Sequence, residues 1–163
     1  MSEVRIIPYD ETYRDDVLAI TIAAWTPVFE KTASEVPRFV YDCFYPSGWK
    51  ARQEQEVRSL LQSEPDNIWL ALAADKPAGF VGIRLHPEDM MGEIYILAVS
   101  PPLQRQGIGR RLMVHAENLI RASGMKMVMV ETIADSGHQP ARRKYEASGY
   151  VQWPVARYFK SLD

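Results

Sequence analysis

The sequence has one cysteine, few histidines and no long apolar run, and each shortage excludes a class of protein. Because Cys43 is the only cysteine, the chain can form no internal disulfide and offers no thiolate cluster to a metal ion. The three histidines (His86, His115 and His138) lack the HExxH spacing of a zinc enzyme. We therefore expect no metal site, and a single cysteine fits a reducing compartment.

The chain also has little net charge. Its 19 Lys and Arg against 21 Asp and Glu give a formal net charge of -2, which provides no general attraction to nucleic acid or to acidic membranes. No stretch approaches the roughly 20 apolar residues that span a bilayer. The first ten residues carry Glu3, Arg5 and Asp10 in place of the apolar run of a signal peptide. We expect no nucleic-acid partner, no membrane partner and a cytoplasmic location.

What the chain does have is the size and composition of an ordinary globular protein. Its 163 residues, 47% of them apolar, suit one hydrophobic core. No repeat or linker divides it. We expect a single domain over residues 1–163.

The hydrophobic pattern predicts alternating strands and helices. Strands are expected at residues 4–8, 68–73, 79–85, 93–99 and 125–133, with one or two more within 150–159. Helices are expected at residues 12–27, 49–63, 107–123 and 140–148, and residues 26–48 show no regular pattern. The strands at 68–73 and 79–85 form an antiparallel hairpin, whereas the strand–helix–strand unit over 93–133 implies a parallel crossover. The fold class is therefore α/β (α+β by some schemes), with a mixed sheet of about six to seven strands and about four helices.

The turn after the central strand holds the clearest chemical signal. Gly107 and Gly109 open a helix there, and glycine lets the backbone approach a ligand closely. The free N–H groups of a first helical turn attract anions, and the helix dipole adds to this. Arg105, Arg110 and Arg111 add positive charge beside these donors. This combination favours a pyrophosphate ligand.

Two other phosphate-binding motifs do not fit this turn. A dinucleotide-binding fingerprint requires a third glycine where Leu112 stands. A P-loop requires Lys and then Ser or Thr after its last glycine, but Gly109 is followed by Arg110 and Arg111. Both motifs are excluded.

These residues resemble those of the GNAT superfamily of N-acetyltransferases. Gln104, Gly107 and Gly109 match its signature Gln/Arg-x-x-Gly-x-Gly/Ala, and the preceding residues 94–99 look like its fourth strand. Downstream, residues 141–150 are similar to the family segment A-x-x-x-Y-x-x-x-G-F/Y. The order of expected elements agrees from about Val4 to Phe159, so the resemblance covers nearly the whole chain.

The resemblance implies a GNAT-like fold with a splay between the fourth and fifth strands, and acetyl-CoA as co-substrate. The backbone of Leu97 and Val99 is then expected to meet the acetyl-thioester and the pantetheine arm. The pyrophosphate is expected to bind the amides of Gln104, Arg105, Gln106, Gly107, Ile108, Gly109 and Arg110. Homodimers are common in this family, which leaves a homodimer open.

Two histidines near these motifs receive different interpretations. Many family members carry Asn where this chain has His138, and that Asn contacts the cofactor arm. The contact is therefore lost here or made by imidazole. His115 is assigned to the outer face of the predicted helix at 107–123.

Acetyl transfer to an amine requires a base, an oxyanion donor and a proton for the leaving thiolate. Glu93 is the first candidate for the base, against the alternative of a solvated strand-end carboxylate, and His138 is the second candidate. The backbone N–H of Leu97 is the expected oxyanion donor. Tyr145 occupies the position of the family's general acid, and its alternative role is a core tyrosine.

The acceptor is expected to be a small-molecule primary amine with an apolar body. The candidate wall of the acceptor pocket consists of Trp25, Phe29, Tyr41, Asp42, Phe44, Tyr45 and Trp49. Asp42 or Glu30 would pair with the positive charge of the amine, and the alternative is a lid of core residues. A protein or peptide amine as acceptor, and a non-catalytic acyl-CoA-binding module, remain alternatives.

Overall fold

The computed structural model describes residues 3–163, whose contacts divide into two compact units. The first unit contains the residues up to Ala24 together with Gln53–Glu131, and the second contains Trp25–Arg52 and Thr132–Asp163. Two helices, α1 (Arg14–Glu35) and α3 (Trp49–Ser63), have residues in both. The single domain inferred from the sequence stays a prediction.

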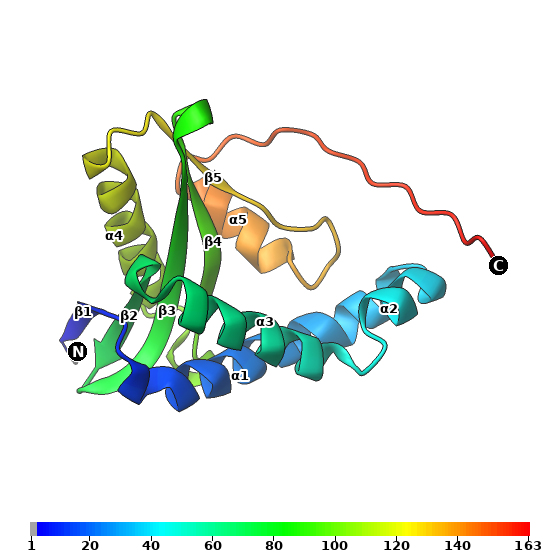
Figure 1. Cartoon of the computed structure of the whole chain (residues 1–163), viewed down its shortest axis with the longest axis horizontal. Coiled ribbons are helices and arrows are strands. Elements are labelled where there is room, and N and C mark those ends of the chain that lie inside the picture. Colours follow the sequence, from blue (N-terminus) through cyan, green and yellow to red (C-terminus); the bar gives the residue numbers. More distant parts are fainter. Residues whose placement is uncertain (1–2) are drawn as a thin grey trace. The chain divides into compact units, whose positions relative to one another are not determined.

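The first unit is built on one five-stranded sheet with strands in the order of the chain (Figure 1). The strands are β1 (Val4–Pro8), β2 (Ile68–Ala73), β3 (Lys76–His86), β4 (Met91–Val99) and β5 (Met127–Val130). The first four pair antiparallel, and β4 pairs parallel to β5 after the crossover helix α4 (Ile108–Ala122). The predicted mixed sheet with one parallel crossover is confirmed.

Helix α4 packs against the sheet through one apolar face. Leu112, Met113, Ala116 and Ile120 lie on that face and are at most 1% exposed. The strands make room for them with glycine, since a Cβ added at Gly92 would collide with Ile120. This packing fixes where α4 begins relative to the end of β4.

The helices at the start of the chain differ from the prediction. Helix α1 passes through Pro27 and ends only at Glu35. The helix tolerates the loss of the one backbone hydrogen bond that proline cannot donate. The segment expected to be irregular contains α2 (Arg38–Phe44). With α5 (Gln139–Ala147), the described residues form five α-helices, not four. Short 3₁₀ turns lie at Glu11–Tyr13, Pro65–Asn67, Pro87–Asp89 and Pro101–Leu103.

The prediction of one or two strands after α5 is wrong. Residues 150–163 form no strand, and the sheet has five strands in place of six to seven. Val151, Trp153 and Val155 are 94%, 85% and 77% exposed, so their alternation with polar residues is not matched by burial. Pro154 also lacks the N–H that a paired strand donates.

Across residues 3–163, no helix combines the length and apolar character needed to cross a membrane.

Candidate functional site

Strand β4 of the first unit loses one of its partners before it ends. Its ladder with β5 covers Met91–Ile94, whereas β4 continues to Val99. Next to the end of this ladder, Tyr95 is an extra residue in the register with β3. Such a bulge increases the local twist of a strand. The ladder between β4 and β5 therefore ends at Ile94, and the splay between the fourth and fifth strands stays a prediction.

The register with β3 determines which backbone groups face this open edge. Ser100 N–H donates to the C=O of Ala78 at 2.8 Å, which makes the two a hydrogen-bonded antiparallel pair. Because such pairs alternate, the backbone N–H and C=O of Leu97 and Val99 point away from β3. The Val99 carbonyl accepts a hydrogen bond from the side-chain Nε2 of Gln104 at 3.0 Å. The polar backbone of Leu97 therefore faces the side of β4 where the β5 ladder has ended.

The turn after β4 has a backbone that suits close approach of a ligand. Arg105 and Gly107 both have positive φ, +62° and +82°, and a Cβ at Gly107 would meet no atom within 4 Å. Helix α4 begins at Ile108, so the N–H groups of Ile108, Gly109 and Arg110 have no acceptor within the helix. With the positive end of the helix dipole, these donors form a site for an anion.

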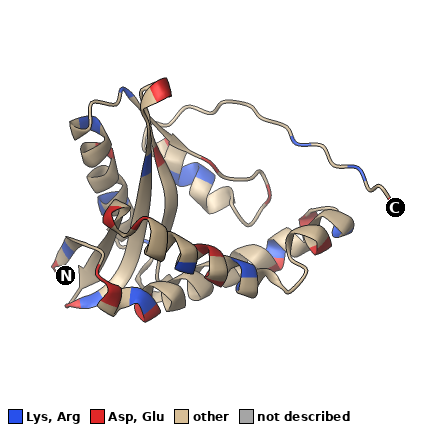
Figure 2. Cartoon of the chain, viewed as in Figure 1, with Lys and Arg blue, Asp and Glu red and all other residues tan. Residues whose placement is uncertain are grey.

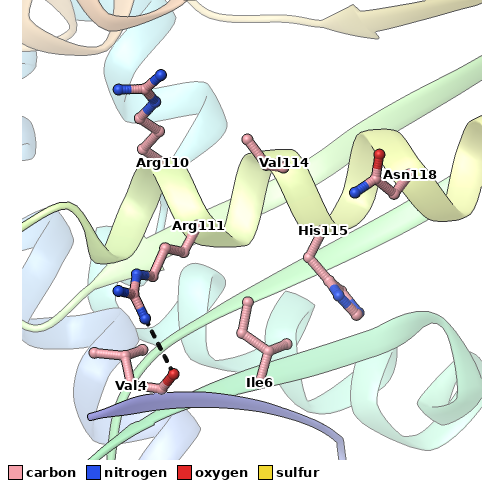
Figure 3. A pocket seen from close by; sticks show the side chains of 7 residues that line it. All are labelled: Val4, Ile6, Arg110, Arg111, Val114, His115 and Asn118. Carbon is pink, nitrogen blue, oxygen red and sulfur yellow. Dashed lines mark hydrogen bonds between the residues drawn. The ribbon is translucent and has the colours of Figure 1, made fainter.

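A shallow depression lies beside the first turns of α4, against β1 (Figure 3). Its lining residues are Val4, Ile6, Arg110, Arg111, Val114, His115 and Asn118. Arg111 points to β1, where Nη1 donates to the C=O of Val4 at 3.2 Å, whereas Arg110 points away from β1. More widely, basic and acidic residues are interspersed along α3 and do not form a basic stripe there (Figure 2).

His115 does not lie on the outer face of α4, as the sequence interpretation had it. Its ring meets Trp69 of β2 at a centroid distance of 5.7 Å, and its Nε2 is buried without a hydrogen-bond partner in the described chain. Burial lowers the pKa of His115, so the ring is neutral at pH 7. The helix places it at the border of the apolar face.

Glu93, the first candidate for the base, is paired. Its Oε2 lies 2.8 Å from Nε2 of His86, and its side chain is only 16% exposed. The hydrogen bond to Glu93 raises the pKa of His86. Glu93 stands four residues before Leu97 on β4, roughly 13 Å at the usual rise of a strand.

In the second unit, part of the predicted acceptor wall forms an aromatic cluster. Phe29 is 6% exposed, stacks on Trp49 at 4.5 Å and meets the edge of Tyr45 at 5.2 Å. Trp25 is half-buried. Asp42 is exposed and paired with the Nε of Arg38 at 2.9 Å on the same helix. An amine that binds Asp42 would therefore compete with Arg38.

The loop before α5 holds a buried carboxylate against His138. The Asp135 side chain is 5% exposed, and its Oδ1 lies 2.5 Å from Nδ1 of His138 and 3.1 Å from the His138 backbone N. Its Oδ2 accepts a hydrogen bond from the hydroxyl of Thr32 at 2.5 Å. Burial acts to raise the pKa of Asp135, but the hydrogen bonds from Thr32 and His138 outweigh burial and hold the pKa below its ordinary value. Asp135 is therefore ionised at neutral pH.

Further hydrogen bonds fix the conformation of this loop. The carboxylate of Glu35 accepts from the N–H of Ser136 at 2.8 Å and also from its hydroxyl. The Nη1 of Arg142 donates to the carbonyls of Ile133 at 2.6 Å and Asp135 at 2.8 Å. Helices α1 and α5 thus both hold the loop that carries Asp135.

Tyr145 lies in α5 with its ring 5.9 Å from that of Tyr150. Burial raises the pKa of Tyr145, so its hydroxyl is protonated at neutral pH. Burial lowers the pKa of the neighbouring Lys144. Tyr145 can therefore serve as a proton donor.

The predicted site residues fall into two groups. Glu93, Leu97, Val99 and the residues from Gln104 to Arg110 are in the first unit, where the turn brings the end of β4 and the start of α4 together. His138, Tyr145 and the acceptor candidates are in the second unit. The contacts that these residues make with a cofactor or an acceptor stay predictions.

Sequence reasoning missed Asp135 and Thr32, and it did not connect His86 with Glu93. The Asp-x-x-His spacing from Asp135 to His138, just before a predicted helix, is the signal that could have found the first. A short polar side chain three residues before a helix start can reach its backbone N–H. For metals, no group of three or more His, Cys, Asp or Glu residues gathers anywhere within residues 3–163.

Comparison with known proteins places these features in a family. The model of the "Acetyltransferase (GNAT) family" matches residues 35–150 of this chain. Mycothiol acetyltransferase from Thermomonospora curvata is 32% identical over 98 residues, which are 60% of this chain and 32% of that protein. The chain spans about a third of the length of the curated relatives it matches.

Two solved structures have a similar fold. An aminoglycoside acetyltransferase, meta-AAC0020, from an uncultured soil metagenomic sample in complex with sisomicin has a TM-score of 0.61 at 20% identity, with 98% of this chain and 97% of that chain covered. The PaiA N-acetyltransferase of Thermoplasma acidophilum in complex with coenzyme A has a TM-score of 0.61 at 15% identity, with 89% and 88% covered. At these identities the likeness shows the fold alone.

Proposed function

Because the chain belongs to the GNAT family of acetyltransferases, we propose that it transfers an acetyl group from acetyl-CoA directly to a primary amine of a small molecule. The observation that carries the proposal is the end of β4, which continues beyond its ladder with β5 and is followed by a glycine turn and an open helix start. When bound, acetyl-CoA supplies the activated acetyl group as a thioester.

The residues present fit this co-substrate. The free N–H groups of Ile108, Gly109 and Arg110 suit the pyrophosphate, and the open space at Gly107 lets a phosphate reach the backbone. We assign the rest of the turn, from Gln104 to Gly107, to the same role. The backbone of Leu97 and Val99 faces the open edge of β4, as an extended pantetheine arm would require.

We assign two of the three chemical functions to Leu97 and Tyr145. The N–H of Leu97 is the proposed donor to the developing oxyanion, and a preorganised donor of this kind contributes about 3 kcal/mol of transition-state stabilisation. The protonated hydroxyl of Tyr145 is the proposed general acid for the leaving thiolate. Glu93 is a candidate base, and it would have to exchange its hydrogen bond with His86 for one with the acceptor.

A small amine with an apolar body remains the proposed acceptor. The stacked rings of Phe29 and Trp49, with the edge of Tyr45, provide a rigid aromatic surface in the second unit. Trp25 and Asp42 complete the proposed acceptor-binding set. Mycothiol acetyltransferase and the aminoglycoside acetyltransferase, by their names, act on small molecules, which supports this choice over a peptide amine.

The test is calorimetric titration of the wild-type protein and Gly107→Trp with acetyl-CoA. Gly124→Trp is the matched control, because Gly124 lies at the other end of α4 with the same φ of +82° and the same open space. We expect wild type and Gly124→Trp to bind and Gly107→Trp to lose binding. Failure of the wild-type protein to bind acetyl-CoA would refute the proposal.

If acetyl-CoA binds, a panel of small primary amines is screened for release of free thiol. Thiol release that depends on an amine separates the enzyme from a non-catalytic acyl-CoA-binding module. Activity with peptide N-termini alone would replace the small-molecule acceptor by a peptide.

A further inference from the structure

The pair formed by Asp135 and His138 has the geometry of an oriented histidine base. An ionised carboxylate can only accept hydrogen bonds, so the 2.5 Å contact requires Nδ1 of His138 to carry a proton. The neutral ring then has its lone pair on Nε2. A carboxylate in this position fixes the tautomer and stabilises the imidazolium that forms when Nε2 takes a proton.

The carboxylate is itself held so that it cannot turn away. Its second oxygen is bound by the hydroxyl of Thr32, a residue that is 4% exposed and 103 positions distant in sequence. Because Arg142 also holds the Asp135 carbonyl, the backbone on which the carboxylate stands is fixed as well. A helix cap alone would need only the bond to the His138 backbone N–H, whereas Asp135 also bonds the imidazole ring and the Thr32 hydroxyl.

His138 nevertheless keeps an accessible end. Its side chain is 21% exposed, and the hydrogen bond to Asp135 uses Nδ1 and not Nε2. The charged groups of this loop region are Asp135, Arg142, which donates to the Asp135 carbonyl, and Glu35, which accepts from Ser136 and interacts with Lys31. Of these, only Asp135 contacts the imidazole ring. The carboxylate of Glu93, in contrast, is already hydrogen-bonded to the imidazole of His86.

We propose that His138 is the general base that deprotonates the acceptor amine, and that Asp135 is its positioning residue. This inference rests on the proposed acetyl transfer. Nε2 accepts a proton from the ammonium group of the acceptor, and the lone pair left on nitrogen forms the C–N bond. The thioester C–S bond breaks with its electron pair on sulfur. Sulfur takes up the second proton lost from nitrogen by way of Tyr145, and His138 returns its proton to water.

The test is the pH profile of kcat under saturating acetyl-CoA and amine. We expect His138→Asn, which places the residue common in the family at this position, to lower kcat by about 10²- to 10⁴-fold and to abolish the acidic limb of the profile. Asp135→Asn is expected to lower kcat and to move that limb to lower pH, since the imidazolium loses its counter-charge.

Glu35→Gln is the matched control, because it makes the same carboxylate-to-amide change in a residue that anchors the same loop through Ser136. Its acidic limb should stay at the wild-type pH. Circular dichroism and acetyl-CoA titration of every variant separate loss of folding from loss of the base.

The outcomes distinguish this inference from the proposed function. If the wild-type protein fails to bind acetyl-CoA, the proposed function fails. If it binds and acetylates an amine, but His138→Asn keeps the wild-type acidic limb, His138 is not the base. If Glu35→Gln moves the limb as far as Asp135→Asn does, Asp135 acts only through the loop.

Discussion

The three histidines of this chain have three different electrostatic surroundings. His86 is paired with a carboxylate at the protein surface, His115 is buried beside Trp69 without a hydrogen bond, and His138 is held by a buried carboxylate. The first environment favours the charged ring and the second favours the neutral ring. The third leaves the side chain 21% exposed. The same residue type thus serves for stability, packing and, as we propose, proton transfer.

The His86–Glu93 pair predicts how stability depends on pH. The pKa of His86 is raised in the folded protein, so its contribution is fully present below the unfolded pKa of about 6.5 and is lost as pH rises through the folded value. We expect the melting temperature of the wild-type protein to fall over that window. In Glu93→Gln the fall should be absent when Tm is measured at pH steps from about 6 to 9. An identical fall in both proteins would show that another group causes it.

Sequence patterns could not have revealed these surroundings. His86 and Glu93 are seven residues apart and meet only because the short turn at Pro87–Asp89 folds β4 back onto β3. Thr32 and Asp135 are 103 residues apart, and Thr32 belongs to a helix that the hydrophobic pattern ended at Pro27. Their residue types were visible, but their partners depend on tertiary structure.

At the scale of the elements, α4 was predicted almost to the residue and α1 was not. Helix α4 has a clear apolar face, and Gly107 and Gly124 with positive φ flank it, so both the pattern and the boundaries are local. Helix α1 has no comparable face, and Pro27 indicates an end that does not occur. β5 has four residues in place of the predicted nine, because its ladder with β4 stops at Ile94.

The packing of α4 predicts a contrast between two neighbouring positions. Leu112 is fully buried, and its side chain fills the space left by Gly79 of β3. Leu112→Ala should lower the free energy of unfolding by about 2–5 kcal/mol, because it leaves a cavity in the core. Val114 is 45% exposed, and Val114→Ala should change it by less than about 0.5 kcal/mol. Urea denaturation measures both, and equal losses would place Leu112 outside the core.

At the scale of the whole molecule, the sequence predicted the fold of the family correctly but predicted the structure of residues 150–159 wrongly. The two motifs, at residues 104–109 and 141–150, are contiguous, so they could be read without any tertiary structure. Whether residues 150–159 form strands depends on a neighbouring strand to pair with, and the sequence of the segment does not show whether one is present. Its apolar residues indicated strands, and the structure leaves them exposed.

This exposure predicts the first site of proteolysis. Residues 151–163 have no secondary structure, and such segments are cleaved before folded ones. Limited trypsin digestion should cut first after Arg157 or Lys160, with the remainder of the chain intact by mass spectrometry. Protection of these bonds at high protein concentration, lost on dilution, would indicate that a second copy covers the segment in solution and would contradict the exposed arrangement.

The hydrogen bond from the Gln104 side chain to the Val99 carbonyl gives the first residue of the Gln/Arg-x-x-Gly-x-Gly/Ala motif a structural role. The family allows Gln or Arg at this position, and both present a planar N–H group that can satisfy a strand's last carbonyl. The first letter of the motif is then a requirement of chain architecture, imposed before any ligand arrives. A relative that binds no acetyl-CoA would still need a side chain here to satisfy this carbonyl.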